Sequence, residues 1–172
     1  MSALFLLRHA KAVAQHAEGD RARGLAEAGR DSARAIAAAI AERHIAPSLV
    51  LCSDAVRTRE TLDIVLPALK PAPEVVYEAA LYLADAKQLL QRLRGVPEDM
   101  RSIMLVGHNP GLQELAVMLS DQPTGPLMAR LMQDFPTAAL IRFEANLPWP
   151  TLERGSARLM AILVPNAAPA KR

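Results

Sequence analysis

The sequence predicts an α/β protein, a three-layer α/β/α sandwich built around a mostly parallel central sheet. Short runs of Leu, Val and Ile alternate with longer Ala-rich or amphipathic segments along the 172 residues. Strands that helices cover on both faces have this near-continuous apolar character. No linker-like stretch interrupts the alternation. We therefore expect one domain over residues 1–172, with a frayed tail at about 165–172.

The predicted strands are five short apolar runs. They cover Leu4 to Leu7, Leu49 to Cys52, Ile103 to Val106, Ala138 to Phe143 and Leu159 to Val164. The Pro-rich loop NLPWPTLERGS separates the last two, which we expect to pair as an antiparallel hairpin at one edge of the sheet. A further short strand is expected just before Glu78.

Four helices are predicted between the strands. They cover Leu25 to Arg43, Arg57 to about Leu69, Asp85 to Arg94, and a segment that begins at Asn109-Pro110. The first carries small and apolar residues at helical spacing on one face. Asn109 is a favourable N-cap, and proline fits the first turn of a helix. We interpret the QPTGP stretch near residue 124 as a loop.

Composition and charge exclude several functions. The formal net charge is only +2 and aromatic residues make up 3%, which argues against a nucleic-acid partner. The single cysteine, Cys52, excludes an intramolecular disulfide and fits a reducing compartment. No apolar run is long enough to span a membrane, and Arg8 interrupts the N-terminal run too early for a signal peptide. We expect a cytoplasmic protein without a membrane partner.

Three of the predicted strands end in residues that can bind an anion. Arg8 and His9 follow the first strand, Arg57 lies just beyond the second, and His108 follows the Ile103 strand. Ligands of open α/β sheets collect at the carboxyl ends of the strands, so we expect these side chains to share one rim. Guanidinium groups match phosphate oxygens with paired N–H donors. Phosphate is therefore the best-fitting substrate class.

Histidine can itself attack phosphorus and form a covalent phosphoryl-enzyme. The attacking nitrogen must be unprotonated, so the other ring nitrogen should donate to a carbonyl or another acceptor. Positively charged donors around the phosphoryl oxygens would stabilise the transition state. The four histidines lack paired ligand spacing and no acidic cluster accompanies them, so we expect neither a metal nor a cofactor.

These residues lie in motifs that resemble a known family. LFLLRHAKA resembles the Arg-His-Gly/Ala signature of the histidine phosphatase superfamily, CSDAVRTRETL its second arginine motif and MLVGHNPGLQELA its second histidine motif. The short chain and FPTAAL are similar to the SixA-type phosphohistidine phosphatases, its compact members. The resemblance runs from residue 4 to about residue 164 and implies a phosphoglycerate mutase-like fold.

The resemblance also implies roles for individual residues. His9 would be the phosphorylated nucleophile, and Arg8, Arg57 and His108 would form the phosphate pocket. Asn109 would bind phosphate as well, and Ser53 would support the pocket or cap a helix.

Two parts of the family pattern stay open. Asp20 and Arg23 match its Asp-x-x-Arg-Pro-Leu-Thr segment, but Gly24 and Ala26 replace the Pro and Thr, so the contacts of residues 19–29 are not predicted. Glu78 is a candidate general acid, with a plain surface carboxylate as the alternative reading. SixA-type members commonly lack the acid, and the labile P–N bond of phosphohistidine needs less proton assistance than an ester.

The expected function is a phosphatase that hydrolyses protein phosphohistidine through a covalent phosphohistidine intermediate and releases inorganic phosphate. One alternative is a phosphatase for small phosphate monoesters. Another is a phosphate-binding module without catalysis, although recognition alone could use arginines and would not require two histidines.

Overall fold

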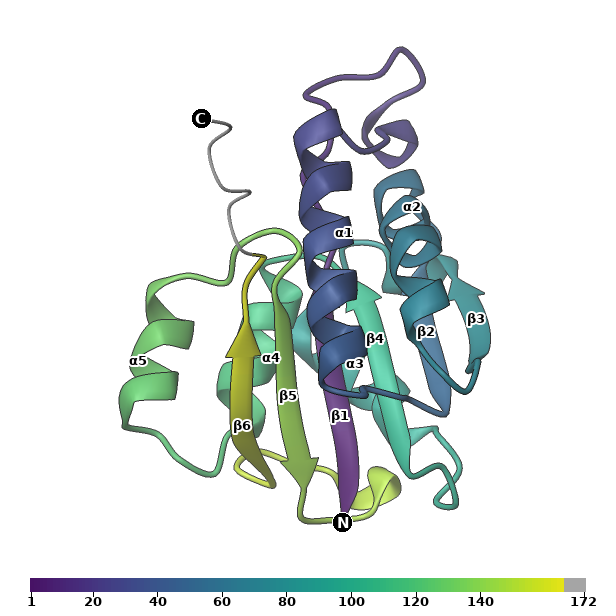
Figure 1. Ribbon diagram of the computed structural model, residues 1–172. Coiled ribbons are helices and arrows are strands. Elements are labelled where there is room, and N and C mark those ends of the chain that lie inside the picture. The colour runs from purple at the N-terminus through teal and green to yellow at the C-terminus, as the bar shows by residue number, and fades with distance from the viewer. Residues whose placement is uncertain (166–172) are drawn as a thin grey trace.

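Three layers make up the computed structural model, which describes residues 1–165 (Figure 1). In this part of the chain a six-stranded sheet has the order β3-β2-β4-β1-β5-β6. The strands are β1 (Ser2–Arg8), β2 (Leu49–Ser53), β3 (Glu74–Glu78), β4 (Ser102–Gly107), β5 (Leu140–Ala145) and β6 (Ala157–Leu163). The parallel pairs are β1 with β4, β4 with β2, and β2 with β3, whereas β5 pairs antiparallel with β1 and β6. The predicted fold class and its antiparallel edge are confirmed.

Helices cover both faces of the sheet. They are α1 (Glu27–Glu42), α2 (Val56–Val65), α3 (Ala86–Arg94), α4 (Gly111–Leu119) and α5 (Pro126–Gln133), with 3-10 turns at Asp20–Ala22, Leu66–Ala68, Ala79–Leu81 and Trp149–Thr151. Figure 1 shows α1 and α2 in front of the sheet, and α3 and α4 behind it. α5 contacts α4 and β6 at the antiparallel edge. None of the helices in residues 1–165 is long and apolar enough to cross a lipid bilayer.

The continuous apolar run of β1 is explained by burial on both faces. Phe5 and Leu7 pack into the cluster formed with α1 and α2, whereas Leu4 and Leu6 pack into the cluster formed with α3, α4 and α5. Neighbouring side chains of a strand point to opposite faces, so a strand between two helical layers is apolar at every position. β1 is thereby fixed firmly up to the point where Arg8 begins.

Helix α5 was not predicted from the sequence. The loop expected at QPTGP is found over residues 122–125, but its last residue, Pro126, begins the helix, and Gly125 directly before it has a φ of 113°. Proline is well suited to the first turn of a helix, so the Gly-Pro pair marks a helix start here as well as a turn. Met128 and Leu131 anchor the helix by packing into the core.

Other boundaries differ by a few residues. The second predicted helix ends at Val65 and continues as a 3-10 turn. β5 begins at Leu140, because Ala138 has a φ of 62° and its N–H donates to the main-chain oxygens of Arg8 and His9. The predicted frayed tail at 165–172 lies, apart from its first residue, outside the described part of the chain.

Candidate active site

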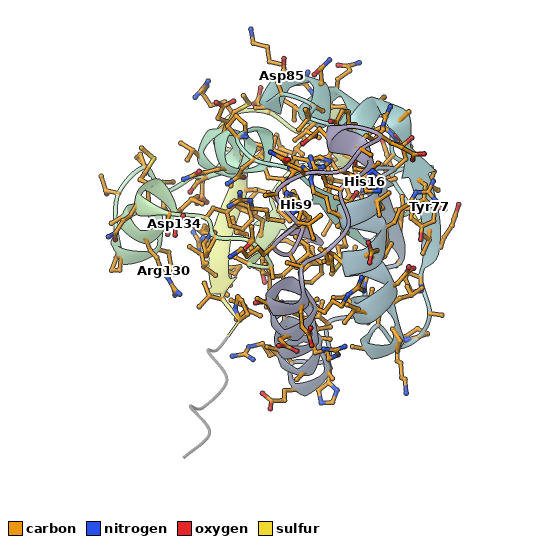
Figure 2. The ribbon with its side chains drawn as sticks, turned by 90° about the horizontal axis from the view of Figure 1, so that it is seen from above. His9, His16, Tyr77, Asp85, Arg130 and Asp134 are labelled. Atoms are coloured by element: carbon orange, nitrogen blue, oxygen red, sulfur yellow. The ribbon has the colours of Figure 1, made fainter. Side chains whose placement is uncertain are left out.

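Four of the predicted site residues meet at the carboxyl ends of the parallel strands. Arg8 ends β1, His9 follows it, Arg57 lies in the first turn of α2, and His108 follows β4. β1 and β4 are paired so that Arg8 lies opposite Gly107, which makes His9 and His108 neighbours. Their ring centroids are 5.4 Å apart with an interplanar angle of 55°. Figure 2 looks onto this end of the sheet, with His9 near the middle of the view.

His9 is held in one tautomer by the main chain. Its Nδ1 lies 2.7 Å from the carbonyl oxygen of Ala10, and because a carbonyl can only accept, Nδ1 carries the proton. Burial lowers the pKa of His9 to about 4, and the positive charges of Arg57, Arg8 and Arg23 act in the same direction. At neutral pH the ring is uncharged, and Nε2 keeps a free electron pair.

His108 is buried, and its two ring nitrogens have different surroundings. Nε2 lies 2.7 Å from the hydroxyl oxygen of Ser53, whereas the buried Nδ1 has no hydrogen-bond partner among residues 1–165. Burial, and next the charge of Arg57, lower the pKa of His108 to about 3. This ring is also uncharged at neutral pH.

Both arginines are fixed by their terminal nitrogens. Arg8 donates from Nη1 to the carbonyl oxygen of Phe135 at 2.9 Å. Arg57, with a side chain only 3% exposed, donates from Nη1 to the main-chain oxygen of Asp20 at 2.9 Å and from Nη2 to its carboxylate at 3.1 Å. The Nε atoms of both arginines are buried and have no partner in the part of the chain that the structure describes. Each guanidinium is therefore oriented by the protein and keeps an unused donor.

Three buried side-chain nitrogens without a partner in the described residues lie in one site. Arg8 Nε, Arg57 Nε and His108 Nδ1 are buried and unpartnered, and in the described residues only one other side-chain atom, Asp121 Oδ1, shares that property. A buried donor without a partner costs about 1–3 kcal/mol, so such atoms are rare unless they serve a ligand. An anion with several acceptor oxygens, such as a phosphoryl group, would satisfy them.

The carboxylate of Asp20 lies in a cluster of side chains that the sequence did not predict. This group accepts hydrogen bonds from Arg57, from Nε of Arg23 at 2.9 Å and from the hydroxyl of Tyr82. These contacts, that of Tyr82 first, hold the pKa of Asp20 well below its ordinary value. The Tyr82 ring in turn lies edge-on to His108, with centroids 5.4 Å apart. The match of Asp20 and Arg23 to the family pattern was the only sequence signal, and Tyr82 had none.

The side-chain amide of Asn109 forms two hydrogen bonds within the protein. Its Nδ2 donates to the carbonyl oxygen of Phe135 at 3.1 Å, and its Oδ1 accepts from the main-chain N–H of Gln113 at 3.2 Å. The amide oxygen fixes the start of α4, and one of the two N–H groups of Nδ2 is used as well. The expected phosphate contact of Asn109, through its second N–H, stays a prediction.

Glu78 is tied to helix α3 and does not approach the histidines through any hydrogen bond. Arg92 donates to both of its carboxylate oxygens at distances of 2.6 to 2.8 Å. This ion pair matches the surface-carboxylate interpretation better than that of a general acid. Within residues 1–165 no group of three or more His, Cys, Asp or Glu side chains is arranged to hold a metal ion.

Comparisons with known proteins agree with this fold. A family model described as the histidine phosphatase superfamily (branch 1) matches residues 4–82. A solved structure from Agrobacterium tumefaciens, provisionally named phosphohistidine phosphatase SixA, is 32% identical, with a TM-score of 0.81 over 95% of this chain and 98% of that chain. A second solved structure, from Nakamurella multipartitia and with the same provisional name, is 26% identical, with a TM-score of 0.83 over 96% of this chain and 97% of that chain. An uncharacterized protein of Mycobacterium leprae is 32% identical over 117 residues, which are 67% of this chain and 70% of that protein.

The fold and these relatives define the class of the protein: it is a phosphatase, hence a hydrolase, with a phosphoglycerate mutase-like α/β fold. The chain belongs to the histidine phosphatase superfamily.

Proposed function

We propose that this protein, acting as a single domain, removes the phosphoryl group from phosphohistidine on a partner protein. The observation that carries the proposal is the unprotonated Nε2 of His9, in a site where the described residues leave the buried Nε donors of Arg8 and Arg57 and the buried Nδ1 of His108 without a partner. A nucleophilic electron pair beside donors for phosphoryl oxygens is the combination that phosphoryl transfer requires.

The reaction proceeds in two displacements. Nε2 of His9 attacks phosphorus, the P–N bond to the substrate breaks, and its electron pair leaves with the substrate imidazole. Water then attacks the phosphorus of the phospho-enzyme, the bond to Nε2 breaks with its electron pair returning to His9, and inorganic phosphate departs with the oxygen and both protons of the water. Arg8, Arg57 and His108 stabilise the charge on the phosphoryl oxygens in both steps. We propose that no metal takes part, because these donors supply the charge stabilisation.

The leaving group favours phosphohistidine over an ester. An imidazole that is protonated on its second nitrogen leaves as a neutral molecule, whereas an alkoxide needs a proton in the transition state. The carboxylate of Glu78 is bound to Arg92, and that of Asp20 is held in its charged form by three donors. Neither carboxylate suits the role of a proton donor. The name of the Agrobacterium relative is consistent with the same substrate class.

A direct test compares substrates and traps the intermediate. We expect kcat/KM to be higher for a histidine-phosphorylated protein than for a panel of sugar, nucleotide and aryl phosphates, and to be unchanged by EDTA. Labelled substrate should leave an acid-labile, base-stable phosphate on the wild-type enzyme and none on His9→Ala. The exposed His16 gives a matched control, since His16→Ala should retain both label and turnover.

Two results would overturn the proposal. Turnover of small esters alone would replace the protein substrate with the small-molecule alternative. Retention of hydrolysis by His9→Ala would remove the covalent mechanism.

A further inference from the structure

We infer that Ser53 is a positioning residue that fixes the tautomer of His108, so that this ring offers an N–H from Nδ1 to the phosphoryl group. The inference rests on the proposed function for its catalytic consequence, whereas the tautomer itself is a property of the resting protein.

The hydroxyl group of Ser53 lies directly against the imidazole ring of His108. It is the last residue of β2 and is fully buried, with Oγ 2.7 Å from Nε2 of His108. Its main-chain oxygen is occupied by the hydroxyl of Thr58, which donates at 2.7 Å. The junction between β2 and α2 therefore holds the Ser53 side chain against His108, which follows β4.

Only one of the two atoms, Ser53 Oγ or His108 Nε2, can donate in their hydrogen bond. Ser53 Oγ already accepts a long hydrogen bond, 3.4 Å, from the main-chain N–H of Ala55, and within residues 1–165 its only other partner is Nε2 of His108. If Nε2 carried a proton, the serine hydroxyl proton would be buried without an acceptor, which is unfavourable. The hydroxyl therefore donates to Nε2, and the single proton of the neutral ring lies on Nδ1.

The two histidine rings therefore have the same tautomer but different roles. His9 and His108 both carry their proton on Nδ1, but His9 uses it to donate to Ala10 and keeps Nε2 bare. His108 uses Nε2 to accept from Ser53 and keeps the N–H of Nδ1 unpartnered. One ring can attack phosphorus while the other donates to its oxygens. Because burial keeps His108 uncharged, the tautomer decides which nitrogen is the donor.

Nuclear magnetic resonance of the histidine rings tests the inference without any substrate. Long-range ¹H–¹⁵N correlations distinguish the two neutral tautomers, and a His108→Ala spectrum assigns the signals. In the wild-type protein at pH 7 we expect a protonated Nδ1 and an unprotonated Nε2 on His108, and in Ser53→Ala a mixture of tautomers. The matched control is Ser102→Ala, at the start of β4 and the opposite end of the sheet, which should leave the spectrum unchanged.

Kinetics then test the catalytic consequence. We expect Ser53→Ala to lower kcat by about tenfold to a hundredfold, and to weaken inhibition by inorganic phosphate, because a fraction of the rings present an acceptor to the anion. Ser53→Thr restores a hydroxyl donor, so its tautomer should return with activity above that of Ser53→Ala. Thermal melting of each variant shows whether it is folded.

A protonated Nε2 in the wild-type protein, or an unchanged tautomer in Ser53→Ala, would overturn the inference. A shifted tautomer with full kcat would limit Ser53 to a structural role. If phosphohistidine proves not to be the substrate, the spectra still decide the tautomer, so the two proposals fail separately.

Discussion

Asp20 presents two oxygen atoms to the guanidinium of Arg57, one from its main chain and one from its carboxylate. Figure 1 shows the loop between β1 and α1, which carries Asp20, above the end of the sheet and next to α2. A buried guanidinium needs a partner for its charge, and here that partner is provided by a loop. The orientation of Arg57 thus depends on residues distant from it in sequence.

The first prediction follows from this contact. Asp20→Ala removes the carboxylate that orients Arg57 and should lower kcat/KM by about 10- to 100-fold, since small displacements of catalytic groups are costly. Steady-state kinetics and inhibition by inorganic phosphate measure the effect. Asp31→Ala is the control, because Asp31 forms a comparable 2.9 Å ion pair with Arg34 on the exposed surface of α1. Equal activity of the two variants would contradict the role of Asp20.

The second prediction concerns the shape of the charge at position 57. Arg57→Lys keeps a positive charge but loses the fork and the Nε donor, so we expect a loss of about 3 kcal/mol in transition-state stabilisation, roughly a hundredfold in kcat/KM. Arg59→Lys is the control, since Arg59 is exposed and stacks on Tyr77 with its guanidinium carbon 4.5 Å from the ring centroid. Near-wild-type kinetics of Arg57→Lys would show that charge alone suffices.

The third prediction concerns stability and pH. Burial lowers the pKa of His9 to about 4 and of His108 to about 3, below the value of about 6.5 in an unfolded chain. Between these values the unfolded state binds more protons than the folded state, so the free energy of unfolding should fall as the pH drops from 6.5 to 4. Above pH 6.5 the stabilising contribution of the two neutral rings is fully present. At about 1.4 kcal/mol per pKa unit, we expect the two rings together to contribute a loss of roughly 6 kcal/mol over this window.

Urea unfolding at several pH values measures this slope. The double variant His9→Gln/His108→Gln should show a flatter dependence than the wild-type protein, and the exposed His16→Gln should not change it. Asp20 does not confuse the comparison, because its lowered pKa makes its own contribution disappear only in stronger acid. Parallel curves for wild type and double variant would refute the prediction.

The fourth prediction is that Glu78 is dispensable for chemistry. Glu78→Gln removes the acid while its side chain can still accept a hydrogen bond from Arg92. We expect kcat on phosphohistidine to stay within about twofold, with an unchanged pH profile, because the leaving imidazole does not need a proton from Glu78. Loss of the alkaline limb of the profile in this variant would identify Glu78 as the acid after all.

The sequence predicted those parts of the molecule that depend on local pattern. The buried strands were visible because every residue of a two-sided strand is apolar, as Leu4 to Leu7 are. Arg8, His9, Arg57 and His108 were found because parallel strands bring their carboxyl ends to one edge. The motifs around these residues identified the family.

The remainder depends on contacts that no local pattern encodes. Asp20 and Tyr82 meet because two loops fold toward each other, and nothing in their neighbouring residues predicts that meeting. Asn109 follows β4 as the sequence indicates, but nothing in its neighbouring residues predicts that its amide contacts the carbonyl oxygen of Phe135. Helix α5 was missed because Gly125-Pro126 serves equally well as a turn and as a helix start.

The carbonyl oxygen of Phe135 accepts hydrogen bonds from both Arg8 and Asn109. One oxygen atom therefore fixes the guanidinium at the end of β1 and also the residue that precedes α4. An alanine scan would overlook this anchor, because replacing the Phe135 ring perturbs core packing but leaves the oxygen atom in the chain. Deleting or inserting one residue beside position 135 would move the oxygen itself. Engineers who graft loops onto this scaffold should therefore treat the length of that segment as fixed, even where its side chains tolerate change.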